Sequence, residues 1–241
     1  MSSLSVLLLV TAGATLLATL SQLLTGFGFA LVLVPMLLLV AAPAQAVGVS
    51  ILLGTVLTLV MAWRDRQHVD RPKLLELLAG SVIGLPLGAV ALHTLSDTTL
   101  KWIIVASVTG ALLVVLANLV LRNRRTTTTL VGIVSGGLLT ASGVNGPPLV
   151  ALLRANQYPP SVYRATIAAI FAVQNVLAAA LLAGTGQITS TILAMVGAGL
   201  VVVPGAYWLG ERLFRHIDAV RLRRGIIAML ALCLLSVLWF R

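Results

Sequence analysis

The chain has 241 residues, of which 59% are hydrophobic and only 9% are charged, and its net charge is +10. Soluble domains carry about 25% charged residues and about 45–50% apolar residues with glycine included. These values, with a mean hydropathy of +1.09, exclude a soluble enzyme, a disordered chain and a disulfide-stapled secreted domain. They predict an all-α polytopic membrane protein, in which the single Cys233 cannot form an internal disulfide.

Taken in chain order, the apolar sequence forms about eight segments, and two of them are interrupted. Residues 4–41 are too long for one membrane helix of about 20 residues, and Gly26-Phe27-Gly28 divides them. Residues 129–153 are divided by the segment Ser142–Pro148, because glycine and proline break or kink a helix. The continuous candidate spans are residues 44–63, 74–93, 98–121, 161–183, 188–208 and 224–240.

Fourteen of the sixteen basic residues gather in four clusters, at residues 64–73, 122–125, 154–164 and 212–224. Loops rich in lysine and arginine face the cytoplasm, so we expect all four clusters on that side. The charges are segregated by loop without interleaved aromatic residues, which disfavours a nucleic-acid-binding face. This orientation predicts that residues 129–153 form a hairpin of two short helices entered from the cytoplasm. Residues 4–41 are expected to form a corresponding hairpin from outside.

The two halves of the chain are similar at a constant offset of 117 residues. The offset pairs glycines or prolines of the same type: Gly26 with Gly143, Pro43 with Pro160, Gly80 with Gly197 and Gly88 with Gly205. With the opposite entry sides of the two hairpins, it predicts two inverted-topology repeats, residues 1–125 and 126–241, in one membrane domain. Each repeat is expected to hold a broken-helix hairpin and three transmembrane helices, with Thr126–Thr129 as a linker between them. The alternative is that glycine and proline are simply frequent in membrane helices.

The two interruptions predict a central binding site. Irregular backbone at membrane depth is tolerated where it lines a cavity, and paired interruptions mark the substrate site of many transporters. The unpaired N–H groups and dipole at a helix N-terminus favour an anion, and glycines let it approach the backbone. The candidate substrate-binding residues are Thr25, Gly26, Phe27, Gly28, Ser142, Gly143, Asn145, Gly146 and Pro147.

Three further candidates lie on the span 161–183. Gln174 and Asn175 are amides near its middle, and interhelical hydrogen bonding is the alternative to ligand contact. Arg164 lies at the inner mouth, where an arginine that extends to the membrane interface is the alternative. We expect no catalytic, metal or cofactor site, because one cysteine and three scattered histidines offer no cluster.

No aspartate or glutamate lies deep in a predicted span, so a cation site built on buried carboxylates is not expected. An anion leaving an inside-negative cell is driven outward by the membrane potential, about 2.3 kcal/mol per charge per 100 mV. Export therefore needs no coupling ion. Import would need one, and His68, His93 and His216 are its titratable candidates.

The order of these motifs resembles the TauE/SafE family of sulfite and organosulfonate exporters, also called the toluene sulfonate uptake permease (TSUP) family. The motifs are Thr25-Gly26-Phe27-Gly28-Phe29, the segment Ser142–Pro148, Arg164-Ala165-Thr166 leading to Gln174-Asn175, Gly84-Leu85-Pro86-Leu87-Gly88 and Pro204-Gly205. The resemblance covers nearly the whole chain. It implies a transporter for small sulfur-containing or carboxylated anions in the bacterial inner membrane.

Three hypotheses follow from these observations. The first is a secondary carrier of small organic or sulfur oxyanions that works as an exporter. The second is a proton-coupled anion uptake permease, which predicts transport that depends on the pH gradient. The third is a membrane scaffold without a transport cycle. The lipid bilayer and a small anion are the expected partners, nucleic acid is not, and a homo-oligomer is left open.

Overall fold

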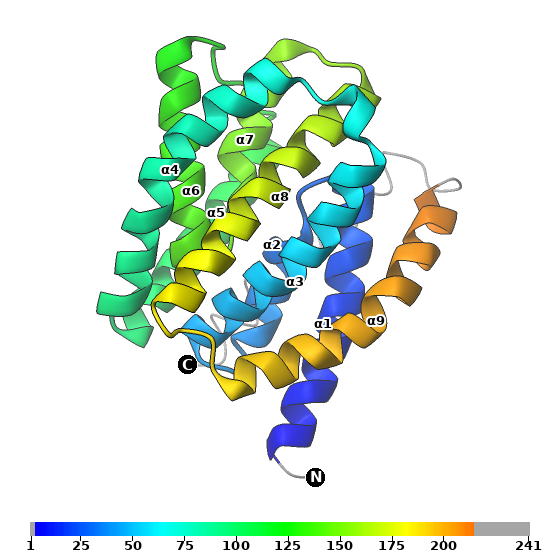
Figure 1. The fold of residues 1–241 in the computed structure, drawn as a ribbon. Helices are drawn as coiled ribbons and strands as arrows, with labels where there is room; N and C mark the ends of the chain where they lie inside the picture. Colours follow the sequence, from blue (N-terminus) through cyan, green and yellow to red (C-terminus); the bar gives the residue numbers. More distant parts are fainter. Residues whose placement is uncertain (1–2, 215–241) are drawn as a thin grey trace.

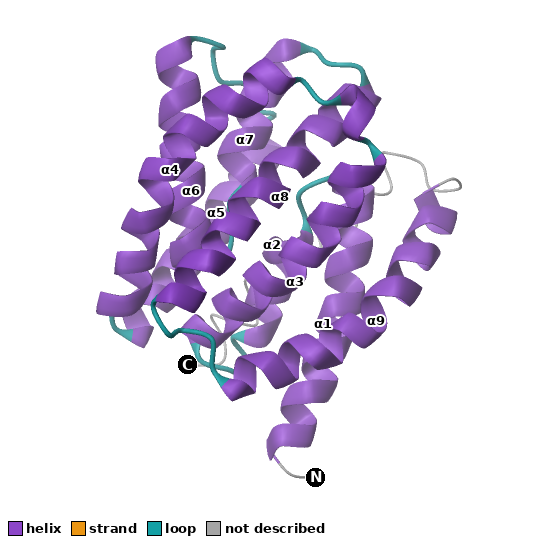
Figure 2. Cartoon of the chain, viewed as in Figure 1, coloured by secondary structure: helices purple, strands orange, loops and turns teal. Residues whose placement is uncertain are grey.

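The computed structural model describes residues 3–214, which form helices and connecting loops without a strand (Figures 1 and 2). The helices of this part of the chain are α1 (Ser3–Thr25), α2 (Phe29–Leu37), α3 (Pro43–Arg64), α4 (Arg71–Thr94), α5 (Asp97–Leu116), α6 (Arg125–Ser142), α7 (Gly146–Leu153), α8 (Pro160–Gly184) and α9 (Ser190–Phe214). Short 3-10 turns cover Arg66–His68 and Arg154–Asn156. The predicted span 224–240 and Cys233 lie outside the described residues.

Six of the described helices are long and apolar enough to cross a membrane: α1, α3, α4, α5, α8 and α9. They confirm an all-helical, multi-pass protein. Helices α2 and α7 have nine and eight residues. At about 1.5 Å per residue they cannot cross a hydrocarbon layer of about 30 Å.

Two sequence-based boundaries were wrong. The span predicted over 98–121 ends at Leu116, and the Leu121 N–H donates instead to the Ala151 carbonyl at 2.9 Å. The expected linker Thr126–Thr129 is helical, because α6 begins at Arg125. Both errors come from reading apolar or polar composition alone, which does not fix a helix end.

Local chemistry fixes several helix starts. Pro43 and Pro160 are the first residues of α3 and α8, where a missing N–H costs no hydrogen bond. The carboxylate of Asp70 caps α4 by accepting from the Lys73 N–H at 3.0 Å. The hydroxyl of Ser96 caps α5 by accepting from the Thr99 N–H at 3.3 Å. Such caps satisfy N–H groups that have no partner within the helix.

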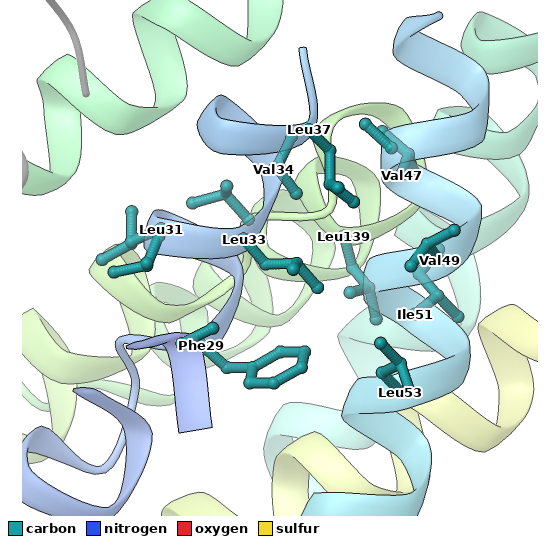
Figure 3. Close-up of a cluster of buried hydrophobic side chains, with 14 of the residues drawn as sticks. Phe29, Leu31, Leu33, Val34, Leu37, Val47, Val49, Ile51, Leu53 and Leu139 are labelled. Atoms are coloured by element: carbon teal, nitrogen blue, oxygen red, sulfur yellow. The ribbon is translucent and has the colours of Figure 1, made fainter. Parts of the chain in front are cut away.

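Three helix pairs make the most extensive contacts: α4 with α6, α1 with α9, and α3 with α8. Figure 1 shows α3 and α8 side by side, with α4 and α6 to one side of them and α1 and α9 to the other. The short helix α2 lies in the interior, where Leu33 and Val34 pack among residues of α3 and Leu139 of α6 (Figure 3). The N-terminal end of α2, at Phe29, is thus buried by protein, whereas Leu39 and Val40 after its C-terminal end are exposed.

Three loops meet at one end of the bundle, which we call the basic end: residues 65–70, 117–124 and 154–159. The ammonium of Lys73 donates to the Asn123 side-chain oxygen at 2.9 Å, and Asn123 in turn bonds Asn156. The Tyr158 hydroxyl donates to the Asp70 carboxylate. Burial, reinforced by this hydrogen bond, raises the pKa of Tyr158 well above its usual range, so the phenol stays a donor. These contacts join the three loops.

Candidate functional site

Two three-residue connections share the same backbone geometry. The first turn, residues 26–28, joins α1 to α2, and the second turn, residues 143–145, joins α6 to α7. Each begins with a glycine in the left-handed region, at φ +83° for Gly26 and φ +75° for Gly143. Only glycine adopts this conformation without strain, which explains why both turns start with it.

The hydrogen bonds of the two turns are also the same. The Gly26 N–H donates to the Gln22 carbonyl at 2.7 Å, and the Gly143 N–H donates to the Leu139 carbonyl at 2.8 Å. The last helical residue caps each turn through its hydroxyl: Thr25 accepts from the Phe27 N–H at 3.2 Å, and Ser142 from the Val144 N–H at 3.3 Å. The threonine–serine pair therefore has one structural role, which is to stop a helix and hold the following turn.

In the interior, the first turn lies against the start of α7 and the second turn lies against α2. A Cβ atom added to Gly146 would lie 3.0 Å from the Phe27 Cβ, and one added to Gly143 would lie 2.9 Å from a Val34 methyl group. Gly28 is packed more tightly, since an added Cβ would lie 2.1 Å from the Ser21 hydroxyl oxygen. Segments more than 100 positions apart in the sequence therefore lie next to each other.

A small central cavity of about 20 Å³ lies between the turns. It is lined by residues of five helices and both turns: Gln22, Phe27, Phe29, Ala30, Ser50, Gly54, Thr58, Leu139, Gly143, Asn145, Phe171 and Asn175. This volume admits about one water molecule. A larger solute can enter only after the surrounding helices separate.

Gln174 has a structural role in this arrangement. Its side chain is 0% exposed. The amide nitrogen donates to the Ser81 hydroxyl at 2.7 Å, and the amide oxygen accepts from the Asn145 side chain at 2.7 Å. The Ser135 hydroxyl also lies 3.3 Å from that oxygen. Both ends of the Gln174 amide are therefore occupied, and the network links α8 to α4, α6 and the second turn.

Asn175 differs from its neighbour. Its side chain is 6% exposed, lines the central cavity and lies 3.5 Å from the position of a Cβ on Gly54. Within residues 3–214 its amide forms no hydrogen bond. Because this amide faces the cavity and has both a donor and an acceptor group, it is available for a ligand there.

The predicted site residues separate into three groups. Phe27, Gly143, Asn145 and Asn175 line the central cavity. Thr25, Gly26, Gly28, Ser142, Gly146 and Gln174 shape its walls without lining it. Pro147 and Arg164 lie elsewhere: Pro147 borders an apolar groove of about 450 Å³ beside α5, and Arg164 lines a second cavity.

That second cavity, which we call the basic-end cavity, has a volume of about 420 Å³. It lies among α1, α3, α8 and α9 and is lined by Leu23, Met61, Arg64, Asp65, His68, Pro160, Ser161, Arg164, Tyr207, Gly210 and Glu211. The charged groups that the described residues contribute to it are two arginines and two carboxylates. It is large enough for a small hydrated anion.

The two cavities share three helices. Leu23 follows Gln22 on α1, Met61 lies one turn beyond Thr58 on α3, and Arg164 lies about two turns before Phe171 on α8. At about 1.5 Å per residue, the separation along these helices is about 2–10 Å. The basic-end cavity therefore leads toward the central cavity.

Sequence reasoning missed several lining residues. Ser50, Gly54 and Thr58 of α3 were not predicted as site residues, although Thr58 aligns with Asn175 at the offset of 117. Gln22 was also missed, and it organises the first turn by donating to the Gly26 carbonyl at 2.9 Å and accepting from the Phe29 N–H at 3.0 Å. Among the described residues there is no group of three or more metal-ligating side chains.

In the described part of the chain, six membrane-length helices surround two short interior helices, with a polar cavity between the turns, and this arrangement is typical of a multi-pass membrane transporter. The chain belongs to the sulfite exporter TauE/SafE family, whose model matches residues 11–237. This confirms the resemblance found in the sequence, and proteins of this family are transporters of sulfite- or sulfonate-type anions and not enzymes. The comparisons with curated proteins and with solved structures gave no match.

Proposed function

We propose that the protein is a secondary transporter that exports small sulfur oxyanions, sulfonates or carboxylates, with the central cavity as its substrate site. The observation that carries this proposal is the Asn175 amide, buried at the cavity wall without a partner among the described residues. The buried polar side chains of residues 3–214 are threonines, serines, asparagines and glutamines. Such hydroxyl and amide groups donate hydrogen bonds to an oxyanion without carrying a charge.

An inverted repeat over residues 1–125 and 126–241 supports alternating access to this site. Two observations support this repeat: the matching turns after α1 and α6, and the recurrence of buried α1 positions in α6 at the offset of 117, namely Thr11 with Thr128, Ala14 with Val131, Ala18 with Ser135 and Gln22 with Leu139. The contact between α1 and α9 also has its counterpart in that between α6 and α4. If the two repeats exchanged their conformations, the site would open first to one side of the membrane and then to the other.

For α9, the offset of 117 residues between the two repeats no longer holds. Gly197 and Gly205 were paired with Gly80 and Gly88, but an added Cβ at either position would meet nothing within 4 Å. The buried residues of α9 include Met195, Gly199, Val203 and Ala206. They follow the buried residues of α4 at an offset of 118, so we assign one inserted residue to the second repeat before α9.

The basic end is assigned to the cytoplasm of a bacterial cell by the positive-inside rule. An anion that enters the basic-end cavity then leaves the cell down the membrane potential. Export requires no proton or sodium gradient under this assignment. A proton-coupled uptake permease would instead depend on the pH gradient.

Flux from proteoliposomes tests the proposal. Purified full-length protein is reconstituted into vesicles loaded with sulfite, and release is followed at a series of potassium diffusion potentials, with protein-free vesicles as the control. We expect release that increases when the sulfite-containing side is made negative and that does not respond to a pH gradient. Absence of sulfite, methanesulfonate and acetate flux at every potential would contradict transport, and flux driven only by a pH gradient would favour uptake.

A further inference from the structure

A single ion pair closes the outer rim of the basic-end cavity. The guanidinium of Arg64, at the last residue of α3, pairs with the carboxylate of Glu211 on α9. The same guanidinium group lies 3.3 Å from the Tyr207 hydroxyl oxygen, one turn earlier on α9. Among the described residues this is the ion pair that joins two helices, since the other, Lys73 with Glu76, lies within α4. It therefore ties α9 to α3 at the basic end.

The pair is accessible from the aqueous side. The side chains of Arg64 and Glu211 are 54% and 36% exposed, and both line the cavity together with Arg164. Ion pairs this exposed are weak, because water screens them and two long side chains must be held in place. A solute anion at the cavity can compete with the carboxylate for the same guanidinium.

We propose that the basic-end cavity is a second anion site, in which a small oxyanion displaces Glu211 from Arg64 and thereby releases the basic end of α9 from α3, while the contacts of Ile192 and Gly199 with α3 remain. An oxyanion matches the guanidinium as a carboxylate does, with paired oxygen acceptors for its planar donors. Arg164 of α8, which also lines the cavity, supplies a second positive charge about two turns from the central cavity. This inference rests on the proposed anion transport, and adds to it the site at which the substrate arrives and loosens the bundle.

The position of Leu23 links anion binding in the basic-end cavity to the opening of a path to the central cavity. Leu23 of α1 and Gly210 of α9 both line the cavity, and an added Cβ on Gly210 would lie 2.5 Å from a Leu23 methyl group. Leu23 and Met61 separate the basic-end cavity from Gln22 and Thr58 of the central cavity. If Glu211 no longer holds α9 to α3, α9 can move away from Leu23 and open this path.

Charge-neutralising variants test the competition directly. Sulfite binding to the purified full-length protein is measured by thermal shift in detergent, and sulfite flux by the proteoliposome assay. We expect Glu211→Gln to bind sulfite about two- to fivefold more tightly, because the competing carboxylate is gone. We expect Arg64→Gln to bind about tenfold more weakly, because a charge-assisted hydrogen bond is lost.

Matched variants separate this effect from a general change of charge. Asp65→Asn removes a carboxylate that lines the same cavity but forms no ion pair with a described residue. Arg66→Gln removes a neighbouring arginine, which stacks on Trp63 outside the cavity. Arg66→Gln should bind sulfite as the wild type does. Asp65→Asn should gain less affinity than Glu211→Gln, because it removes a repelling charge but no competitor for the Arg64 guanidinium. A gain of affinity in Glu211→Gln cannot arise from misfolding, so this variant stays informative if Arg64→Gln is unstable.

The proposed transport function and the proposed second anion site are contradicted by different results. A wild-type protein that moves no anion overturns the proposed function and with it this inference. A wild-type protein that transports sulfite, while Glu211→Gln binds it no more tightly than Asp65→Asn does, overturns the second site alone. Equal loss of affinity in Arg64→Gln and Arg66→Gln would overturn it as well.

Discussion

Helices α4 and α6 meet through their backbones, whereas α1 and α9 meet through side chains. A Cβ atom added to Gly84 would lie 2.0 Å from the Ile133 carbonyl oxygen, and one added to Gly132 would lie 2.3 Å from the Leu77 carbonyl oxygen. Neither backbone can yield without moving a whole helix. Small residues on both sides are what permit this approach in a membrane.

The counterpart pair has different contacts. A Cβ added to Gly199 of α9 would lie 3.0 Å from the Thr15 hydroxyl oxygen of α1, and one added to Gly210 would lie 2.5 Å from a Leu23 methyl group, so both would meet side chains and not backbone. Where α6 has Gly132 and Gly136, α1 has Thr15 and Thr19 at the offset of 117. Their hydroxyls are buried and have no hydrogen-bond partner within the described residues.

The difference indicates which pair moves. The α4 and α6 pair is close-packed, and the polar contacts of Lys73, Asn123 and Tyr158 hold it at the basic end. The α1 and α9 pair borders the basic-end cavity, and within residues 3–214 one exposed ion pair joins it to α3, beside apolar contacts of Ile192 and Gly199 with α3. We therefore expect the first pair to act as a frame and the second to change position during transport.

The largest expected effect is that of Gly84→Val. Its side chain would overlap the Ile133 carbonyl group, and the overpacking should cost more than about 3 kcal/mol. We expect no monodisperse protein by size-exclusion chromatography in detergent. The control is Gly197→Val, since an added Cβ at Gly197 meets nothing within 4 Å. Normal folding of Gly84→Val would show that the frame is not close-packed.

The second prediction compares two neighbouring amides. Gln174→Leu leaves Ser81 and Asn145 without their partner, so it should lower the free energy of unfolding by about 1–3 kcal/mol. Asn175→Leu removes an amide that has no partner in residues 3–214, so we expect little loss of stability. Its sulfite flux should fall about tenfold, because a hydrogen bond to a charged ligand is lost.

Thermal unfolding in detergent and sulfite flux in vesicles measure the two effects separately. A stable Gln174→Leu protein would contradict the structural role of that amide. Full transport by Asn175→Leu would remove the central cavity as the substrate site.

The same two residues show what the sequence can predict. The composition and the Gly and Pro interruptions located the helices and both turns, because these depend on local chemistry. In the sequence, Gln174 and Asn175 are both candidate site residues. Neighbouring residues of a helix point about 100° apart, so Gln174 bonds Ser81 of α4 while Asn175 lines the central cavity. Which face meets a cavity is decided by the packing of α4, α6 and α3, and that packing depends on distant residues.

Arg164 and Pro147 show the same limit. Each lies next to a motif that helps form the site, yet Arg164 is about two turns from the central cavity and Pro147 faces α5. The backbone contact of α4 with α6 was also missed. Glycines at intervals of four residues, Gly80, Gly84 and Gly88, are a signal that could have revealed it.

A smaller effect is expected from removing hydroxyls at the basic end. Tyr158→Phe loses a bond to Asp70 that helps to hold the frame, and should cost about 1 kcal/mol of unfolding free energy. Tyr207→Phe loses only a contact with the exposed Arg64, and should cost less than about 0.5 kcal/mol. Chemical denaturation in mixed micelles measures both. An equal or reversed cost would contradict the division between frame and moving pair.

The smallest effect is expected for Thr15→Val, which removes one of the buried unpaired hydroxyls of α1. That hydroxyl has no partner among the described residues, so the substitution breaks no hydrogen bond. We expect the free energy of unfolding to change by less than about 0.5 kcal/mol, in either direction. The matched variant is Thr140→Val on α6, whose hydroxyl donates to the Leu85 carbonyl of α4 at 2.8 Å. Loss of this interhelical bond should cost about 0.6–1.7 kcal/mol. If Thr15→Val were the more damaging of the two in the same denaturation assay, α1 and α9 would be held by polar contacts after all, and the assignment of motion to this pair would be wrong.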